Sequence, residues 1–255
     1  MKRITVIFIS IAALTLSGCV SQPKDYQSEG QGDGPKSAAQ INAQLGLGYL
    51  SQKKYKIAML KLKKALHQDP ELAEAHHYIG ELYNQLEQYK EAEEHYKRAI
   101  ELAPYSSILQ NNYGAFLYQS GKFREALTHF ENALKDPLYR APDQLYENIG
   151  RCYYRIPDVK NAEINFRKAL ELNQNLPGSL YYMALINYDE KNFMNTRAYL
   201  QRYRSVAKHT SRTLWLGIKT ERELGDKDAV SSYTLLLKSQ FPDSDETRLL
   251  MEKEK

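Results

Sequence analysis

The chain has 255 residues, of which 26% are charged and 42% hydrophobic, and its formal net charge is +4 at pH 7. This length and composition are typical of a folded protein with a substantial core. Lysine and glutamate alternate within the predicted helices, whereas a nucleic-acid-binding protein gathers its basic residues on one face. The charge pattern therefore excludes nucleic acid as an expected partner.

The first 18 residues predict a bacterial lipoprotein signal peptide. Lys2 and Arg3 precede an apolar stretch of thirteen residues, 4–16, which is too short to anchor the chain because a bilayer takes about 20. The residues LSGC follow and resemble the lipobox of bacterial lipoproteins. This resemblance implies cleavage before Cys19 and its acylation; the alternative is an ordinary secretory signal with an incidental cysteine. Because Val20 follows rather than aspartate, it also implies the outer membrane, with the protein facing the periplasm.

Residues 19–38 are the predicted lipidated N-terminus and linker. They are rich in glycine, serine, glutamine and proline and show no apolar period, which is typical of a flexible linker. A flexible chain of about 19 residues averages about 25 Å from end to end. We therefore expect the membrane to be a partner through the lipid anchor, with the folded part held clear of the headgroups.

Residues 39–243 contain a repeat with a period of 34 residues. Gly46, Gly80 and Gly114 are 34 residues apart, and Gly150 continues the series after a two-residue insertion. An aromatic or leucine residue and a second alanine follow in each unit. This order resembles the tetratricopeptide repeat, whose unit is a helix, a turn and a helix. The first alanine comes twelve residues after each glycine, at Ala58, Ala92, Ala126 and Ala162.

Each small residue has a packing role in such a unit. The glycine lets the second helix approach the first, and the alanines leave room for the next unit. Pro70 and Pro104 end their units, because proline cannot continue a helix interior. Every unit leaves an apolar face that only its neighbour can cover, so we expect stability to come largely from contacts between neighbours.

The sequence predicts an all-α fold, and the resemblance implies a right-handed superhelical solenoid of about six tetratricopeptide repeats. The pattern weakens in the last two units, and in the fifth Thr196 and Tyr203 replace the alanines. Residues 244–255 are predicted to be a charged C-terminal tail. The predicted units lie near residues 39–72, 73–106, 107–142, 143–176, 177–209 and 210–243.

The sequence shows no motif of a known catalytic site. It lacks HExxH, GxxxxGK[ST] and GxSxG, the signatures of zinc proteases, phosphate-binding loops and serine hydrolases. His76 and His77 are adjacent, so they diverge by about 100° on a helix and suit no shared metal ion. Cys152 is predicted to be a small buried residue. We therefore expect no enzyme, no cofactor and no metal site.

A protein-binding groove is the expected functional feature. In tetratricopeptide repeats the first helix of each unit lines the concave side, so candidate positions can be carried over by register. The lining is mixed polar and aromatic, and it does not reproduce the lysine-rich clamp of chaperone-binding repeats. The alternative is a solvated inner face without a ligand. The candidate groove residues are His77, Glu81, Asn111, Ala115, Tyr118, Glu147, Arg151 and Tyr154.

More specific sequence is present in NNYGAFLY at 111–118, DPLYRAPDQLYENIGRC at 136–152, ALELNQNLPGSLYYMA at 169–184 and the stretch 214–244. Together with the lipobox, these segments resemble the PilF/PilW family of type IV pilus biogenesis and stability lipoproteins. The resemblance implies a pilotin that binds the pilus secretin subunit and promotes its outer-membrane localisation and multimerisation. Other pilus assembly proteins are further candidate partners. A lipoprotein adaptor for periplasmic cell-wall enzymes fits the composition and period equally well.

Overall fold

The computed structural model describes residues 36–253, and every regular element in this range is an α-helix, which confirms the predicted all-α fold. The signal peptide, Cys19 and nearly all of the linker lie outside the described residues. The helices are α1 (Ala38–Ser51), α2 (Tyr55–Gln68), α3 (Ala73–Gln85), α4 (Tyr89–Leu102), α5 (Ser107–Gln119), α6 (Phe123–Leu134), α7 (Pro142–Arg155), α8 (Val159–Leu172), α9 (Pro177–Asp189), α10 (Phe193–Val206), α11 (Ser211–Leu224), α12 (Lys227–Gln240) and α13 (Asp245–Lys253).

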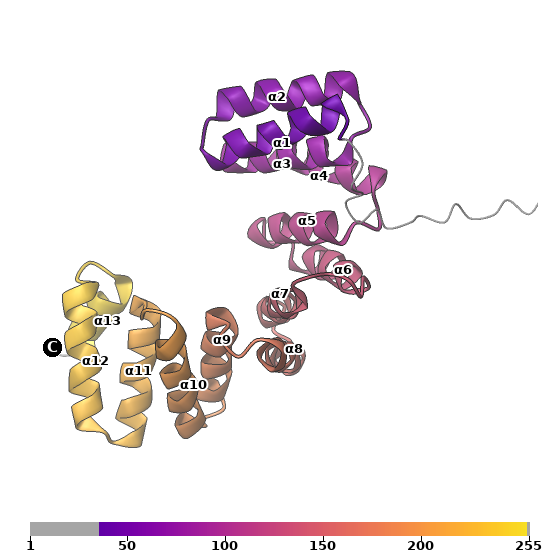
Figure 1. Ribbon diagram of the computed structural model, residues 1–255. Coiled ribbons are helices and arrows are strands. Elements are labelled where there is room, and N and C mark those ends of the chain that lie inside the picture. Colours follow the sequence, from indigo (N-terminus) through magenta and orange to yellow (C-terminus); the bar gives the residue numbers. More distant parts are fainter. Residues whose placement is uncertain (1–35, 254–255) are drawn as a thin grey trace, which may run out of the picture. The chain divides into compact units, whose positions relative to one another are not determined.

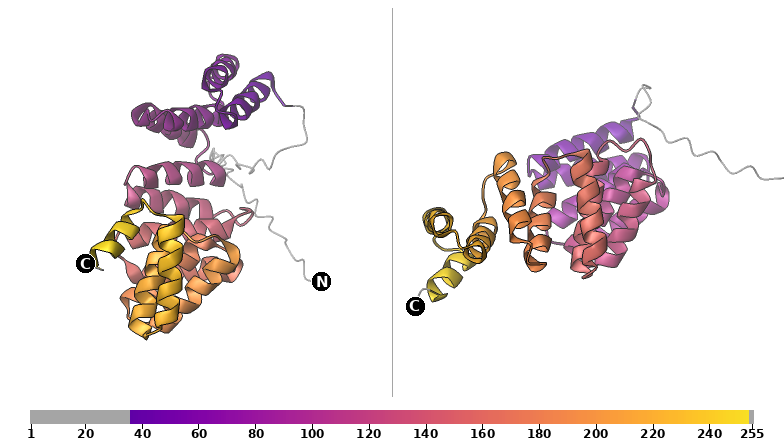
Figure 2. Two further views of the ribbon diagram at one scale, coloured as in Figure 1. Left: turned by 90° about the vertical axis from the view of Figure 1, so that its left-hand side faces the viewer. Right: turned by 90° about the horizontal axis from the view of Figure 1, so that it is seen from below.

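The helices pair in chain order, and each pair is one repeat unit. Unit 1 is α1 packed on α2, and the following pairs form units 2 to 6, ending with α11 on α12. Each unit also contacts the next, as α2 contacts α3 and α8 contacts α9. Figure 1 shows this succession of hairpins, and Figure 2 shows it from two further sides. The described chain is therefore a tetratricopeptide solenoid, in which the core runs from unit to unit.

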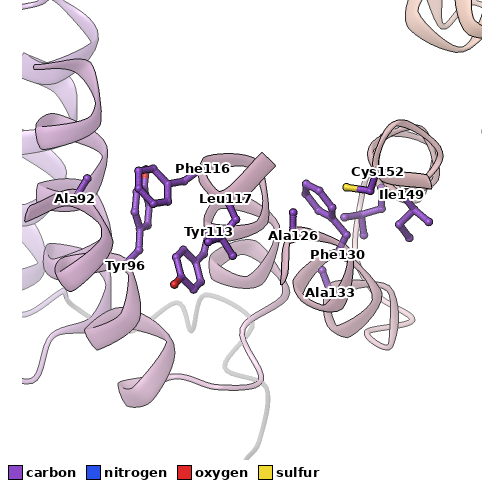
Figure 3. Packing of buried hydrophobic residues seen from close by; sticks show 11 residues of the cluster. Ala92, Tyr96, Tyr113, Phe116, Leu117, Ala126, Phe130, Ala133, Ile149 and Cys152 are labelled. Carbon is purple, nitrogen blue, oxygen red and sulfur yellow. The ribbon is translucent and has the colours of Figure 1, made fainter. Parts of the chain in front are cut away.

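In units 3 and 4 a glycine packed against an aromatic ring sets the distance between the two helices. A Cβ atom at Gly114 would lie 2.9 Å from the Phe130 ring, and one at Gly150 would lie 2.8 Å from the Phe166 ring. Both rings are almost completely buried. Figure 3 shows Phe130 in the core cluster that also contains Ala126. A larger side chain than glycine would have to displace the ring, because protein cores are close-packed.

The turn between the two helices repeats with the same backbone geometry. One residue in each turn has a positive φ, and these residues follow one another at the spacing of the units. This left-handed conformation costs a residue other than glycine roughly 1–2 kcal/mol. The ring of a proline normally holds φ near −65°. Pro157 is therefore the residue type least suited to the positive φ of this turn. The residues and their φ angles are Lys53 (57°), Glu87 (59°), Gly121 (78°), Pro157 (32°), Lys191 (61°) and Gly225 (75°).

The prediction of a charged C-terminal tail was wrong, because Asp245–Lys253 forms α13. Thr247 and Leu250 are fully buried, and α13 contacts α11 and α12. Leu250 joins a cluster with Leu214 and Leu237, the apolar side of the last unit. In this position α13 covers the apolar side of unit 6, as a capping element of a solenoid does. No helix in residues 36–253 is long and apolar enough to cross a membrane.

Candidate functional site

A cavity of about 280 Å³ opens at the boundary between units 3 and 4. Three residues that the repeat register predicted for the groove line it together: Ala115 and Tyr118 from α5, and Arg151 from α7. Because α5 and α7 are the first helices of successive units, the cavity lies where a groove of this fold is expected. Its lining is completed by Gln119, Phe123, Asn148 and Arg155, with parts of Gly121 and Phe130.

Two arginines flank a pair of aromatic rings along the cavity. The Arg151 guanidinium carbon lies 4.7 Å from the centre of the Tyr118 ring, and that of Arg155 lies 4.6 Å from the centre of the Phe123 ring. Tyr118 and Phe123 meet edge to face, with their centres 5.3 Å apart. Each guanidinium thus lies over a ring at cation–π distance. Arg155 is exposed and keeps its N–H groups for another partner, whereas Arg151 is partly buried and also hydrogen-bonds to Tyr118 and Tyr182.

This arrangement suits a partner with a carboxylate. A guanidinium fixed on an aromatic face offers two parallel N–H donors, the geometry that a carboxylate accepts best. Within the described residues the buried Arg151 Nε has no hydrogen-bond partner. The charge comes from arginine and not from the lysines of the chaperone-binding clamp, so the expected absence of that clamp does not exclude recognition of acidic side chains.

A related contact recurs two units further along. Lys219 of α11 lies with its Nζ 4.4 Å from the centre of the Tyr188 ring of α9. Tyr188 in turn meets Phe193 edge to face at 5.5 Å. These three residues occupy the repeat positions of Arg151, Tyr118 and Phe123. A cation over an aromatic pair is therefore placed at two successive odd-numbered boundaries of the solenoid, units 3 to 4 and units 5 to 6.

His77 and Glu81 do not reach the cavity. The His77 side chain is buried on α3, where its Nε2 lies 3.0 Å from Asn112 Nδ2 of the next unit. Burial lowers the pKa of His77 to about 4, so its ring is neutral at pH 7. Glu81 accepts a hydrogen bond of 2.8 Å from the hydroxyl of Tyr96. His77 thus links α3 to α5 of the next unit, and Glu81 links α3 to α4 of its own unit. Register alone assigns both positions to an open groove, but in the structure an adjacent helix contacts them.

Three other predicted groove residues also make contacts between units. Glu147 accepts two hydrogen bonds of 2.8 Å from the backbone N–H and the hydroxyl of Ser179, at the start of α9. Tyr154 packs edge to face on Tyr182, with ring centres 5.1 Å apart. Asn111 accepts a hydrogen bond of 3.4 Å from Asn148. Of the three, Asn111 is joined to a residue of the cavity wall.

The histidines and the cysteine have structural partners. His76 lies with its Nδ1 3.1 Å from His95 Nδ1 and so faces away from the partner of His77, as their adjacency predicts. Cys152 is fully buried, which confirms the prediction for it, and burial raises the pKa of its thiol to about 12. Among residues 36–253 no group of three or more His, Cys, Asp or Glu side chains is placed to hold a metal ion.

Comparison with known proteins identifies the repeat and the family. Residues 73–106 and 117–179 match tetratricopeptide repeat families. Over 242 residues the chain is 31% identical to the type IV pilus assembly protein PilF of Pseudomonas aeruginosa, an alignment that covers 95% of each chain. The chain belongs to the PilF family.

Solved structures of PilF-family proteins have the same fold. The Pseudomonas aeruginosa PilF structure matches with a TM-score of 0.79 and 31% identity over 85% of this chain and 97% of that one. The crystal structure of PilW, described as a widely conserved type IV pilus biogenesis factor, matches with a TM-score of 0.76 and 26% identity over 85% of this chain and all of that one. PilF-family membership gives this chain a role in pilus biogenesis through protein–protein interaction.

The prediction from repeat register did not include Gln119, Phe123, Asn148 and Arg155, which also line the cavity of this PilF-family chain. Arg155 and Asn148 lie four residues after and three before Arg151, so the helical period places all three on one side of α7. That spacing was the signal that could have found them. Phe123 begins α6 and occupies the aromatic turn position of the repeat, which reads first as a packing residue. Gln119 ends α5, beyond the positions that the register assigns to the groove.

Proposed function

We propose that this chain is a lipid-anchored outer-membrane pilotin that faces the periplasm, binds the type IV pilus secretin and promotes its localisation and multimerisation. The observation that carries this proposal is the match to PilF along nearly the whole chain. The LSGC sequence at the predicted cleavage site supports the anchor. No catalytic step is needed, because a tether alone raises the effective concentration of a bound subunit near its membrane.

The cavity between units 3 and 4 is the proposed secretin contact. Arg151 and Arg155 would receive acidic side chains of a secretin segment, and Tyr118 and Phe123 would contact its apolar atoms. Aromatic and arginine residues in a partly enclosed site are the residue types that dominate binding energy at protein interfaces. Both arginines are already fixed on rings, so little side-chain freedom would be lost on binding.

The double variant Arg151→Gln with Arg155→Gln tests this contact. We expect it to lower secretin capture in a pull-down by about tenfold or more, because each lost charge-assisted hydrogen bond is worth roughly 1.5–3 kcal/mol. The matched control is Arg167→Gln with Lys168→Gln, which removes two positive charges from α8 in the same unit, where both side chains are exposed. Equal capture by both double variants, with unchanged circular dichroism, would place the secretin contact elsewhere.

Deletion of the gene separates the proposed function from its rival. We expect loss of surface pili and of secretin multimers, whereas disturbed cell shape or lysis would favour an adaptor for cell-wall enzymes. Cys19→Ser should leave a soluble periplasmic protein and a mislocalised secretin, because the acyl chains would be absent. Normal secretin assembly at the outer membrane in the Cys19→Ser strain would argue against the role of the anchor.

A further inference from the structure

Unit 1 carries a concentration of positive charge that the rest of the solenoid lacks. Residues 36–68 include seven lysines and no aspartate or glutamate. Four of these lysines lie on α2, so that the alternation of lysine and glutamate expected for the helices fails there. The next unit differs, because the corresponding helix α4 has two lysines and one arginine against four glutamates.

The α2 lysines surround exposed apolar side chains. The helix buries Ala58, Leu62 and Ala65 against its neighbours. On the opposite side Leu60 is 67% exposed and Ile57 is 42% exposed. Because residues three and four apart share a side of a helix, Leu60 is flanked by three exposed lysines. We call this surface the α2 basic face; its residues are Lys56, Ile57, Leu60, Lys63 and Lys64.

Unit 4 shows what the α2 basic face lacks. The same repeat positions on α8 are Lys160, Ile164, Arg167 and Lys168, so its composition is similar. There, however, Glu163 forms an ion pair of 2.6 Å with Arg167, and Lys168 lies 5.3 Å from the centre of the Tyr146 ring.

On α2 the position of Glu163 is taken by Met59. Within residues 36–253 no ion pair forms with Lys56, Lys61, Lys63 or Lys64. The positive charge of the α2 basic face is therefore uncompensated by neighbouring carboxylates.

We propose that the α2 basic face docks on a bilayer surface of anionic phospholipid. A helix that presents apolar side chains between lysines binds the boundary between headgroups and acyl chains, where the charges meet phosphates and the apolar atoms enter the bilayer. The long lysine stems allow this, because they lie along apolar surface while the ammonium groups stay in water.

The position of α2 favours lipid over an acidic protein. Leu60 and Ile57 protrude from an outer helix face, and neither lines a described cavity that could enclose a partner side chain. Unit 1 is also the unit nearest in sequence to the predicted acylation site, Cys19. The α2 basic face and the cavity between units 3 and 4 share no residue, so both contacts can be tested separately. The lipid contact does not depend on what that cavity binds.

Vesicle sedimentation of the chain from Val20 onward, without acyl chains, tests the proposal. This chain keeps all of the described residues, 36–253, which lie within one compact unit. We expect binding to vesicles of phosphatidylethanolamine with phosphatidylglycerol and little binding to vesicles of phosphatidylcholine alone. The triple variant Lys56→Gln, Lys63→Gln, Lys64→Gln should bind the anionic vesicles about tenfold less tightly or weaker still. Leu60→Gln should also bind less tightly, because the apolar contribution would be lost.

The matched control is the triple variant Lys160→Gln, Arg167→Gln, Lys168→Gln, which makes the same charge change at the same repeat positions of unit 4. It should bind within about twofold of the unsubstituted chain, since the electrostatic attraction falls off within a Debye length of the surface. Equal loss in both triple variants would overturn the proposal, because net charge would then explain binding. So would absent binding to anionic vesicles, or lysine-dependent binding to an acidic peptide alone.

Discussion

Units 3 and 4 and units 5 and 6 have the same arrangement of helix pairs but different interiors. In units 3 and 4 a glycine on the first helix receives a phenylalanine from the second, as Gly114 receives Phe130. In unit 5 the corresponding residues are Ala184 and Leu200, both buried in one cluster. The methyl group added on one helix is offset by a smaller side chain on the other. The spacing of the helices is thus kept while both residues change.

Polar side chains also enter the interior of the last two units. Thr196 and Thr220 are fully buried and donate their hydroxyl hydrogen bonds to backbone carbonyls one turn earlier, at 3.1 Å and 2.7 Å. Glu221 is 3% exposed and pairs with Arg197 of the preceding unit, which also contacts Asp226 at 3.2 Å. Unit 3 also buries polar side chains, such as Gln110, which donates to the carbonyl of Pro104. Among the described residues, what distinguishes the last two units is a buried carboxylate, that of Glu221.

The largest expected effect is at the buried ion pair. Arg197→Ala should lower the free energy of unfolding by about 3–5 kcal/mol, because the carboxylate of Glu221 would stay buried without its ion-pair partner. Glu163→Ala, which breaks the exposed pair with Arg167 in unit 4, should cost at most about 1 kcal/mol. Urea unfolding followed by circular dichroism measures both. Similar losses in the two variants would show that the last units do not depend on this pair.

Acid should weaken unit 2 through His77. Its pKa of about 4 in the folded chain lies below the ordinary 6.5, so the unfolded chain takes up the proton first. The contribution of the neutral His77 ring to the free energy of unfolding is fully present above pH 6.5. It falls as the pH drops toward 4, by roughly 3 kcal/mol in all. His77→Gln should make the slope of stability against pH shallower in this range. The other histidines are present in both chains, so an unchanged slope would contradict the burial of a neutral His77.

Replacement of Gly114 tests whether the space between the two helices of unit 3 is filled by Phe130. Gly114→Leu should cost about 1–3 kcal/mol by overpacking against Phe130. Gly48→Leu on α1 is the control, since a Cβ there meets nothing within 4 Å. The double variant Gly114→Ala with Phe130→Leu copies the pair found in unit 5 and should recover part of the loss. Thermal melting of the four chains would show whether it does; a double variant as unstable as Gly114→Leu would disprove the compensation.

The smallest effect is expected at the turns. Glu87 has a φ of 59°, whereas the equivalent turns of units 3 and 6 have glycine. Glu87→Gly should raise the free energy of unfolding by about 0.5–1 kcal/mol, because glycine adopts this conformation without the steric cost but is freer when unfolded. Glu87→Ala should bring no gain. A gain in the alanine variant as well would point to the lost charge and not to the backbone.

The fold was predictable because a few small residues mark every unit. The repeated glycine, alanine and aromatic positions specify which helix surfaces meet, so units 1 to 4 were recognisable from their spacing alone. Units 5 and 6 were less so, because Thr196 and the Ala184–Leu200 pair keep the geometry with other residues. The last helix, α13, was missed because a single buried leucine among charged residues does not show the repeated apolar spacing that predicts a helix.

The lining of the candidate cavity was predictable only in part. Register places a residue on the inner side of its helix, and this was enough for Ala115, Tyr118 and Arg151. It does not reveal whether the next unit covers that residue, which is why His77 and Glu147 proved to be links between helices. The contact between Arg155 and Phe123 depends on how two units stack, and a single sequence contains no direct record of that stacking.

The cavity at units 3 and 4 has walls from two separate repeats, and this has a mechanical consequence. Its width is set by how the two repeats stack, so any change in the angle between them would change it. A partner segment seated between Tyr118 and Arg151 would therefore contact both repeats at once and restrain their movement against each other.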